Sequence, residues 1–310
     1  MPLRTAPLPR MAGRLSFMRA PVVTLADLRP GMVAALGVPL DSRRGSARQT
    51  RFGPTALRET SAYFGSHFSA NMQAAMDIDR RRVLEGGLMS GGLVDLGDLC
   101  LEGLDRGAAD DAIGTAASAI AARGALPLLL GGDLDIVPPA LDGLARGQPA
   151  GPALVQLGGP SPSVPPGTPA LWLGAGAPQA LTDPGPAAGP AESAGAAPRR
   201  TRQHLGVDDA LDERLAAATR GRRSFVVLDL SVLAAHWHGM HEHAPFDALG
   251  LRELRPVIAS LGHLPLAGFA VTGLEATRSG LSTVKTGQRL ILTALLDLLY
   301  RCLPAQRAAG

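Results

Sequence analysis

The chain has 310 residues, a length that fits one large α/β domain as well as two smaller domains. Apolar residues make up 46% of it, which supplies a sizeable core and excludes wholesale disorder. With 30 basic and 27 acidic side chains, the net charge is only +3. The short arginine clusters also contain no interleaved aromatic residues, so we expect no nucleic-acid partner. No apolar run is long enough to span a bilayer, so we expect no membrane contact either.

Residues 1–30 are rich in Pro and Arg and contain no acidic side chain before Asp27, which predicts a flexible N-terminal arm. No apolar signal segment is recognisable there, and we therefore expect a cytoplasmic protein. Cys100 and Cys302 are too few and too far apart to indicate a disulfide framework or a thiolate metal site.

Beyond residue 30, short apolar runs alternate with helical segments. The apolar runs predict strands over 33–38, 93–96, 125–130, 153–157, 170–173, 224–230 and 267–272. The segments between them predict helices over 55–61, 110–122, 136–145, 208–218, 251–261 and 284–301. Continuous apolar strands favour a parallel sheet with helices on both faces, so we predict one α/β domain over 31–303 with a Pro/Ala/Gly-rich loop at about 179–200.

Ligands of an open parallel sheet bind beyond the carboxyl ends of its strands. The residues that follow the predicted strands are therefore the candidates for chemistry. They are Asp41 with Ser42, Asp95 with Asp98, Asp133 with Asp135, Gly158 to Pro162, Asp229 with Ser231, and Gly273 with Glu275.

Four segments resemble the arginase and agmatinase (ureohydrolase) family. GVPLDSRRGSARQTRFGPTALRE over 37–59 is similar to the family's opening signature, and VDLGDL over 94–99 to its next element. LPLLLGGDLD over 126–135 resembles its Gly-Gly-Asp-His-Ser strand end, and SFVVLDLSVL over 224–233 its Ser-Phe-Asp-Ile-Asp strand. The resemblance implies a three-layer α/β/α fold with a parallel sheet of about eight strands, and assembly into trimers or hexamers.

The family hydrolyses guanidino groups to urea with two Mn²⁺ ions. Its six metal ligands are the His after Gly-Gly-Asp, an Asp-x-His-x-Asp on the next strand and an Asp-x-Asp on a later one. Such hard ions prefer carboxylates and imidazoles, and the metal pair lowers the pKa of bound water. Carried over to this chain, Asp229 is the only retained ligand. The substituted ligand positions are Leu134, Gly158, Pro160, Pro162 and Ser231, and the family's substrate-binding Glu aligns with Gly273, or with Glu275 after a slip.

One ligand of six does not offset the repulsion between two divalent ions. We therefore expect no cofactor, no catalytic residue and no intact metal site. The vestigial active-site positions are Asp133, Leu134, Asp135, Gly158, Pro160, Pro162, Asp229, Ser231 and Gly273. The predicted function is that of a pseudoenzyme, a non-catalytic or regulatory binding subunit that forms homo- or hetero-oligomers with an active ureohydrolase homologue.

Other interpretations stay open. The first is an active ureohydrolase that cleaves agmatine, arginine or another guanidino compound, either without a metal or through a rebuilt metal site. The residues for such a rebuilt site are Asp229 with His236, His238, His241 and His243, or Asp133, Asp135 and Asp229. The second is a structural protein whose Pro/Ala-rich loop docks a partner. Asp41, Arg51 and Arg58 are interpreted as structural ion pairs and caps.

Overall fold

The computed structural model describes residues 15–42, 50–64, 74–77, 82–85, 92–146, 150–159, 164–165, 167–173, 209–233 and 249–274. Several predictions fall on other parts of the chain and lie outside the described residues. They are the helix over 284–301, the loop at about 179–200, Pro160, Pro162, Glu275 and the histidines His236, His238, His241 and His243.

A parallel sheet of seven strands lies at the centre, in the order β4-β1-β5-β9-β8-β6-β7. Its strands are β1 (Val33–Gly37), β4 (Leu93–Asp98), β5 (Leu126–Leu130), β6 (Ala153–Leu157), β7 (Ala170–Leu173), β8 (Ser224–Asp229) and β9 (Leu266–Thr272). Every residue of β1, β5, β6, β8 and β9 is buried, because helices cover both faces. The predicted parallel sheet is confirmed, with seven strands in the described residues where about eight were expected.

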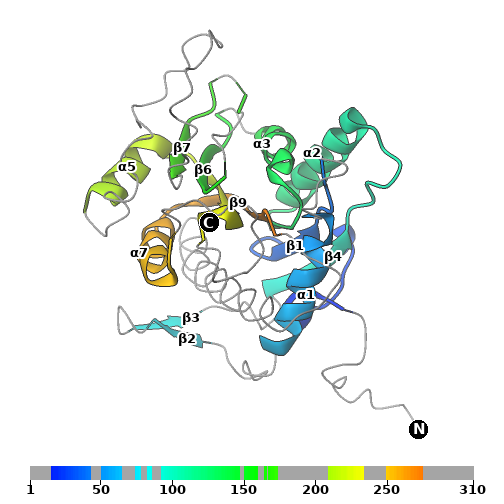
Figure 1. Cartoon of the computed structure of the whole chain (residues 1–310), viewed down its shortest axis with the longest axis horizontal. Helices are drawn as coiled ribbons and strands as arrows, with labels where there is room; N and C mark the ends of the chain where they lie inside the picture. Colours follow the sequence, from blue (N-terminus) through cyan, green and yellow to red (C-terminus); the bar gives the residue numbers. More distant parts are fainter. Residues whose placement is uncertain are drawn as a thin grey trace.

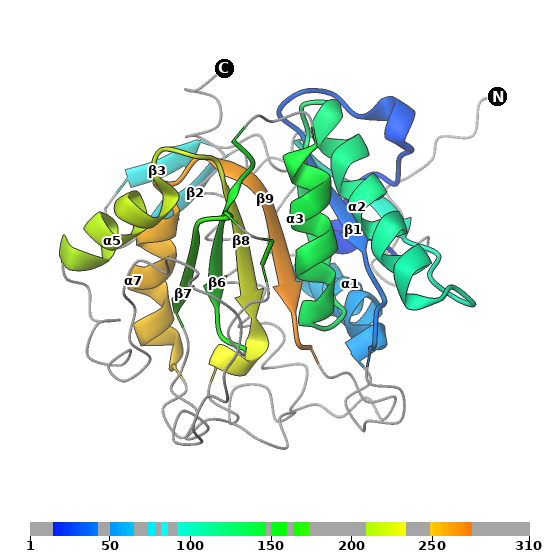
Figure 2. The same cartoon turned by 90° about the horizontal axis from the view of Figure 1, so that it is seen from above.

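Helices form a layer on each face of the sheet (Figures 1 and 2). The first layer contains α1 (Gly53–Phe64), α5 (Asp209–Thr219) and α7 (Leu251–Leu261), and the second contains α2 (Arg106–Ala122) and α3 (Val137–Ala145). Successive strand residues point to opposite faces, so Val33 packs in the core of the first layer and Ala34 in that of the second. The predicted three-layer α/β/α architecture is therefore confirmed.

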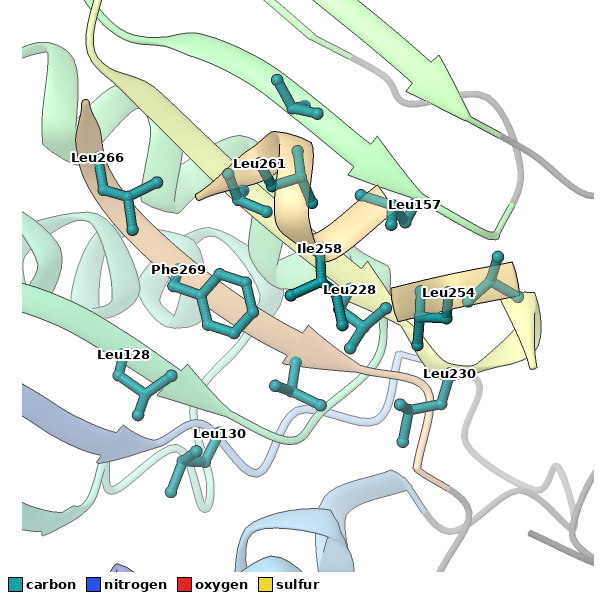
Figure 3. Close-up of a cluster of buried hydrophobic side chains, with 14 of the residues drawn as sticks. Leu128, Leu130, Leu157, Leu228, Leu230, Leu254, Ile258, Leu261, Leu266 and Phe269 are labelled. Carbon is teal, nitrogen blue, oxygen red and sulfur yellow. The ribbon is translucent and has the colours of Figure 1, made fainter. Parts of the chain in front are cut away.

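The core beneath α7 holds the centre of the sheet in place (Figure 3). Leu254 and Ile258 of α7 belong to one buried cluster with Leu228 of β8 and Phe269 of β9. Leu230, the first residue after β8, joins the same cluster. This packing fixes the carboxyl ends of β8 and β9, where the candidate site lies.

Two local features differ from the predictions. Helix α2 begins at Arg106, earlier than the predicted Asp110, because the Asp105 carboxylate accepts a 2.8 Å hydrogen bond from the Ala108 N–H and caps the helix. A separate antiparallel hairpin of β2 (Ala74–Asp77) and β3 (Arg82–Glu85) was not predicted, since neither segment is a continuous apolar run. No helix within the described ranges combines the length and the apolar composition that crossing a membrane requires.

The prediction of a flexible arm over 1–30 is wrong for residues 15–30. Phe17 and Met18 are buried, with 0% and 1% of their surface exposed. The Phe17 N–H donates to Oδ2 of Asp95 at 2.6 Å, and the Met18 N–H donates to Oγ of Ser61 at 2.8 Å. The Pro- and Arg-rich composition suggested flexibility, but two isolated apolar residues anchor this segment to the core.

The same segment also continues the sheet beyond β4, the strand at its edge. The Asp95 N–H donates to the Pro21 carbonyl at 2.9 Å, and the Val23 N–H donates to the Asp95 carbonyl at 3.0 Å. Val22 and Asp95 thereby form a parallel bridge. The N-terminal segment is part of the domain and covers one edge of its sheet.

Candidate functional site at four strand ends

The strands β5, β9, β8 and β6 are neighbours in the sheet, so their carboxyl ends lie side by side. The predicted site positions that follow them meet there. A Cβ atom added at Gly159, after β6, would lie 2.2 Å from Cδ1 of Leu134, after β5, and 3.4 Å from Cγ of Asp229, at the end of β8. A Cβ atom added at Gly273, after β9, would lie 2.7 Å from Oδ2 of Asp229. The described positions thus form one cluster around the Asp229 carboxylate.

Asp229 is buried and bound by protein donors at both carboxylate oxygens. Its Oδ1 accepts the Ser231 N–H at 3.0 Å and also the Ser231 hydroxyl, and its Oδ2 accepts the Thr272 hydroxyl at 2.8 Å. The contact with the Ser231 N–H makes Asp229 the N-cap of the short helical turn Leu230–Val232. Asp229, which the resemblance predicted as the retained ligand, therefore links the ends of β8 and β9 through these hydrogen bonds.

Ser231 connects the end of β8 to the end of β6. Its hydroxyl donates to Asp229 and accepts the Gly159 N–H at 2.8 Å. A carboxylate at this position could still accept the Gly159 N–H, but it could not donate to Asp229. Serine therefore satisfies the neighbouring carboxylate where an aspartate would repel it.

Gly158 is the position that the resemblance predicted to replace the first Asp of the family's Asp-x-His-x-Asp. Its φ is +76°, and a Cβ atom there would lie 2.7 Å from both the Asp229 carbonyl oxygen and Cβ of Val232. The Gly158 carbonyl accepts 2.9 Å and 3.3 Å hydrogen bonds from the side chains of Gln156 and Trp172. This backbone leaves no room for a ligand side chain at the position.

Leu134 is the position that the resemblance predicted to replace the family's first ligand His. It opens the helical turn Leu134–Ile136 after β5, and Asp133 caps that turn by accepting the Asp135 N–H at 3.1 Å. The Leu134 side chain is half-buried against the second core layer, and its Cδ1 faces Gly159. An aliphatic group without a lone pair therefore lies in the cluster around Asp229.

Asp133 and Asp135 bind residues other than Asp229. The Ser42 N–H donates to Oδ2 of Asp133 at 2.7 Å, and burial raises the pKa of the Asp133 carboxyl. Arg106 donates to Oδ2 of Asp135 at 2.8 Å, where half of the Asp135 side chain is exposed. Among the described residues no three His, Cys, Asp or Glu side chains are grouped so as to hold a metal ion. The alternative acidic site made of Asp133, Asp135 and Asp229 is therefore not formed.

Arg58 makes the buried ion pair that the sequence predicted as structural. Its Nε donates to Oδ2 of Asp95 at 2.8 Å and its second nitrogen to Oδ1 at 2.9 Å, while Asp98 accepts from the remaining one. Arg58 and Asp95 are 4% and 1% exposed. Burial alone would lower the pKa of Arg58, but the hydrogen bonds that it donates to Asp95 and Asp98 raise it, so the guanidinium stays charged. Arg51 instead lies over the Phe52 ring, 5.2 Å from its centroid.

Sequence reasoning missed four polar residues of these strand ends: Thr272, Gln156, Ser42 as a partner of Asp133, and Arg106 as a partner of Asp135. Thr272 and Gln156 are polar residues inside apolar strands, and this signal is present in the sequence. Gln156 donates to the Gly158 carbonyl two residues along the chain, whereas the partner of Thr272 follows from the strand order, which places β9 beside β8.

The residues at these strand ends do not fit two Mn²⁺ ions. Leu134 supplies no donor atom, Gly158 has neither a side chain nor room for one, and both oxygens of Asp229 are bound by protein donors. Pro160 and Pro162 lie outside the described residues, and a proline side chain has no donor atom. Two divalent ions need several carboxylates, which this set does not provide.

Residues 32–157 match the arginase family. The human protein named guanidino acid hydrolase, mitochondrial, is 33% identical over 138 residues, which are 44% of this chain and 35% of that protein. The chicken (Gallus gallus) protein named agmatinase, mitochondrial, is 34% identical over 138 residues, which are 44% of this chain and 36% of that protein. The matched part thus spans about a third of the length of these relatives.

Solved structures share the fold over almost the whole chain. Proclavaminate amidino hydrolase from Streptomyces clavuligerus gives a TM-score of 0.68 at 23% identity, over 96% of this chain and 100% of that one. A hypothetical agmatinase from Burkholderia thailandensis gives 0.65 at 20% identity, over 97% and 94% of the two chains. At these identities the likeness concerns the fold. The chain thus matches the arginase family in sequence over residues 32–157 and shares the fold of these amidino hydrolase and agmatinase structures over almost its whole length.

Proposed function

We propose that this protein is a non-catalytic member of the arginase family that acts by binding, as a regulatory subunit. The observation that carries the proposal is the state of Asp229, the only retained ligand position. Its carboxylate is buried and accepts hydrogen bonds at both oxygens from Ser231 and Thr272, and the aliphatic side chain of Leu134 lies in the same cluster. A carboxylate used in this way does not hold the metal-activated water on which hydrolysis by the family would depend.

The proposal includes the absence of a manganese cofactor at these strand ends. Oδ1 of Asp229 already accepts both the Ser231 N–H and the Ser231 hydroxyl, so a divalent ion bound at that oxygen would displace one of these donors. That change costs a buried hydrogen bond, and the described residues contain no group of three or more His, Cys, Asp or Glu side chains that could hold the ion in compensation.

The partner we propose is an active ureohydrolase homologue, joined in a homo- or hetero-oligomer. Support comes from the arginase-family match over residues 32–157 and from the fold, which covers almost the whole chain. A protein that keeps this fold and differs at the strand ends would present to a homologue a subunit surface similar to the homologue's own. This part of the proposal rests on analogy at the level of the fold.

Metal content and urea release test the loss of catalysis. The full chain is purified from cells grown with manganese, its metal content is measured, and urea is assayed with arginine, agmatine and a guanidino acid. We expect no bound manganese and no urea. Stoichiometric manganese that disappears in Asp229→Ala, or urea release above that of the buffer, would contradict the proposal. Urea release that disappears in His236→Ala or His238→Ala would support the alternative of an active enzyme with a rebuilt site.

Co-expression tests the partner. The tagged chain is produced together with a ureohydrolase that has all six ligand side chains, and complexes are separated by size. We expect a mixed oligomer whose urea release per active subunit differs from that of the ureohydrolase alone. A chain that elutes as a monomer and leaves the co-expressed activity unchanged would contradict the regulatory role.

The cytoplasmic location expected from the sequence stays a prediction. The names of the human and chicken relatives place those proteins in mitochondria. Fractionation of cells that express the tagged chain distinguishes the two compartments, and recovery with the mitochondrial matrix would contradict the prediction.

A further inference from the structure

We infer that a clamp of protein hydrogen bonds and one leucine joins the four strand ends in place of the metal pair. We define the clamp as Leu134, Gly159, Asp229, Ser231 and Thr272. The inference concerns the same strand ends as the proposed function, but it does not depend on a partner or on what the protein binds.

The polar part of the clamp links three strands. The Gly159 N–H, after β6, donates to Ser231 Oγ at 2.8 Å, and the Ser231 hydroxyl donates to Oδ1 of Asp229, the last residue of β8. Thr272, the last residue of β9, donates to the other carboxylate oxygen at 2.8 Å. Thr272 is fully buried and Asp229 is 4% exposed, so these charge-assisted bonds form away from water and are strong.

The apolar part of the clamp brings in β5. Leu134 extends from the turn after β5, and its Cδ1 occupies the position toward which a side chain at Gly159 would point. On the opposite side, Gly273 leaves room for the carboxylate, since a Cβ atom there would lie 2.7 Å from Oδ2 of Asp229. The substituted positions therefore complement one another: two glycines make the space that a leucine and a carboxylate fill.

This complementarity predicts how the stability of the protein responds to manganese and to substitution. The thermal unfolding midpoint of the full chain should be the same in MnCl₂ and in EDTA, because a ligand stabilises only a protein that binds it. Ser231→Ala and Thr272→Val should each lower the midpoint by about 5 °C, to the same extent in both solutions, since each removes a hydrogen bond to a buried carboxylate. Thr272→Ser keeps the hydroxyl and should restore most of the loss.

Ser224→Ala is the matched control. Ser224 begins the strand that Asp229 ends, it is fully buried, and its hydroxyl has no hydrogen-bond partner. The same substitution as in Ser231→Ala should therefore leave the midpoint unchanged or raise it slightly. A difference between the two variants isolates the hydrogen bonds of the clamp from the general effect of removing a serine hydroxyl.

Two results would overturn the inference. One is a midpoint of the native chain that rises in MnCl₂ and does not rise in Asp229→Asn. The other is a Ser231→Ala midpoint no lower than that of Ser224→Ala, with Thr272→Val and Thr272→Ser indistinguishable. If the second result is found and the chain releases no urea, the clamp is contradicted but the proposed function is not. Urea release by a chain whose Ser231 and Thr272 variants behave as expected would overturn the proposed function and leave the clamp standing.

Discussion

The two halves of this domain use buried charge differently. Residues 32–157, which match the arginase family, contain an ion pair between Arg58 and Asp95 that is almost completely buried. In the described part of 158–274 the buried carboxylate is Asp229, and its partners are hydroxyl and N–H groups. Strands of both halves contribute to the same two apolar clusters. The difference is therefore confined to polar side chains and does not extend to the core.

This comparison separates charges that support the fold from charges that would support chemistry. The Arg58–Asp95 pair joins α1 to β4, and Asp95 also binds the N-terminal segment through Phe17. At the strand ends of the second half, Asp229 is bound by hydroxyl and N–H donors, Gly158 and Gly273 carry no side chain, and the sheet still forms. Parallel strands buried on both faces are stabilised by apolar packing, so they do not require a metal pair at their ends.

The largest effect we expect is that of breaking the buried ion pair. Asp95→Ala leaves the Arg58 guanidinium buried without its main partner and removes acceptors for the Phe17 and Gly97 N–H groups. The free energy of unfolding, measured by urea denaturation, should fall by about 3–5 kcal/mol. Asp98→Ala is the control, because Asp98 binds the same arginine with a side chain that is 44% exposed. Equal losses in the two variants would show that burial does not decide the effect.

A side chain at Gly158 should have the next largest effect. Gly158→Ala combines an unfavourable positive φ with contacts of 2.7 Å to the Asp229 carbonyl and Val232, and we expect a loss of about 2–4 kcal/mol in the free energy of unfolding. Gly167→Ala has a similar φ of +80° and no atom within 4 Å of the new Cβ, so it should lose only about 1–2 kcal/mol. If both variants lose the same amount, the space at position 158 is not restricted and a ligand side chain would fit.

The titration of Asp133 should change the free energy of unfolding by less than either of these substitutions does. Burial raises the pKa of this carboxyl above its unfolded value, so the folded state binds its proton more tightly than the unfolded state does. The resulting stability is fully present below the ordinary pKa of Asp, about 3.9, and is lost as the pH rises through the raised value. Asp133→Asn lacks this titration. The free energy of unfolding of Asp133→Asn relative to the native chain should therefore increase from acidic to neutral pH, and a constant difference would contradict the shift.

The smallest effect we expect is that of Arg106→Ala. Arg106 binds Asp110 one turn along α2 and Asp135 after β5, but about half of its side chain is exposed, as is that of Asp135. Exposed pairs contribute little, so the loss in the free energy of unfolding should stay below about 1 kcal/mol and should shrink further in 1 M NaCl. A loss as large as that of Asp95→Ala would remove the distinction between buried and exposed pairs.

Pattern reasoning located the described strands of the central sheet because buried parallel strands are continuous apolar runs. It also placed Leu134, Gly158, Asp229 and Gly273 after the correct strands. It did not find the anchoring of Phe17 and Met18, since their partners Asp95 and Ser61 are distant in the sequence. Nor did it find Thr272 as a donor to Asp229, because that contact follows from the adjacency of β8 and β9 and not from spacing along the chain.

The N-terminal segment has a practical consequence for where this domain begins. A protein started at residue 31, the boundary that composition suggested, would lack Phe17 and Met18 from its core and would leave the backbone of Asp95 in β4 without partners. An uncovered edge strand pairs readily with strands of other molecules. Such a shortened protein should therefore self-associate through β4. Residues 15–30 thus protect the domain from aggregation as well as contributing to its fold.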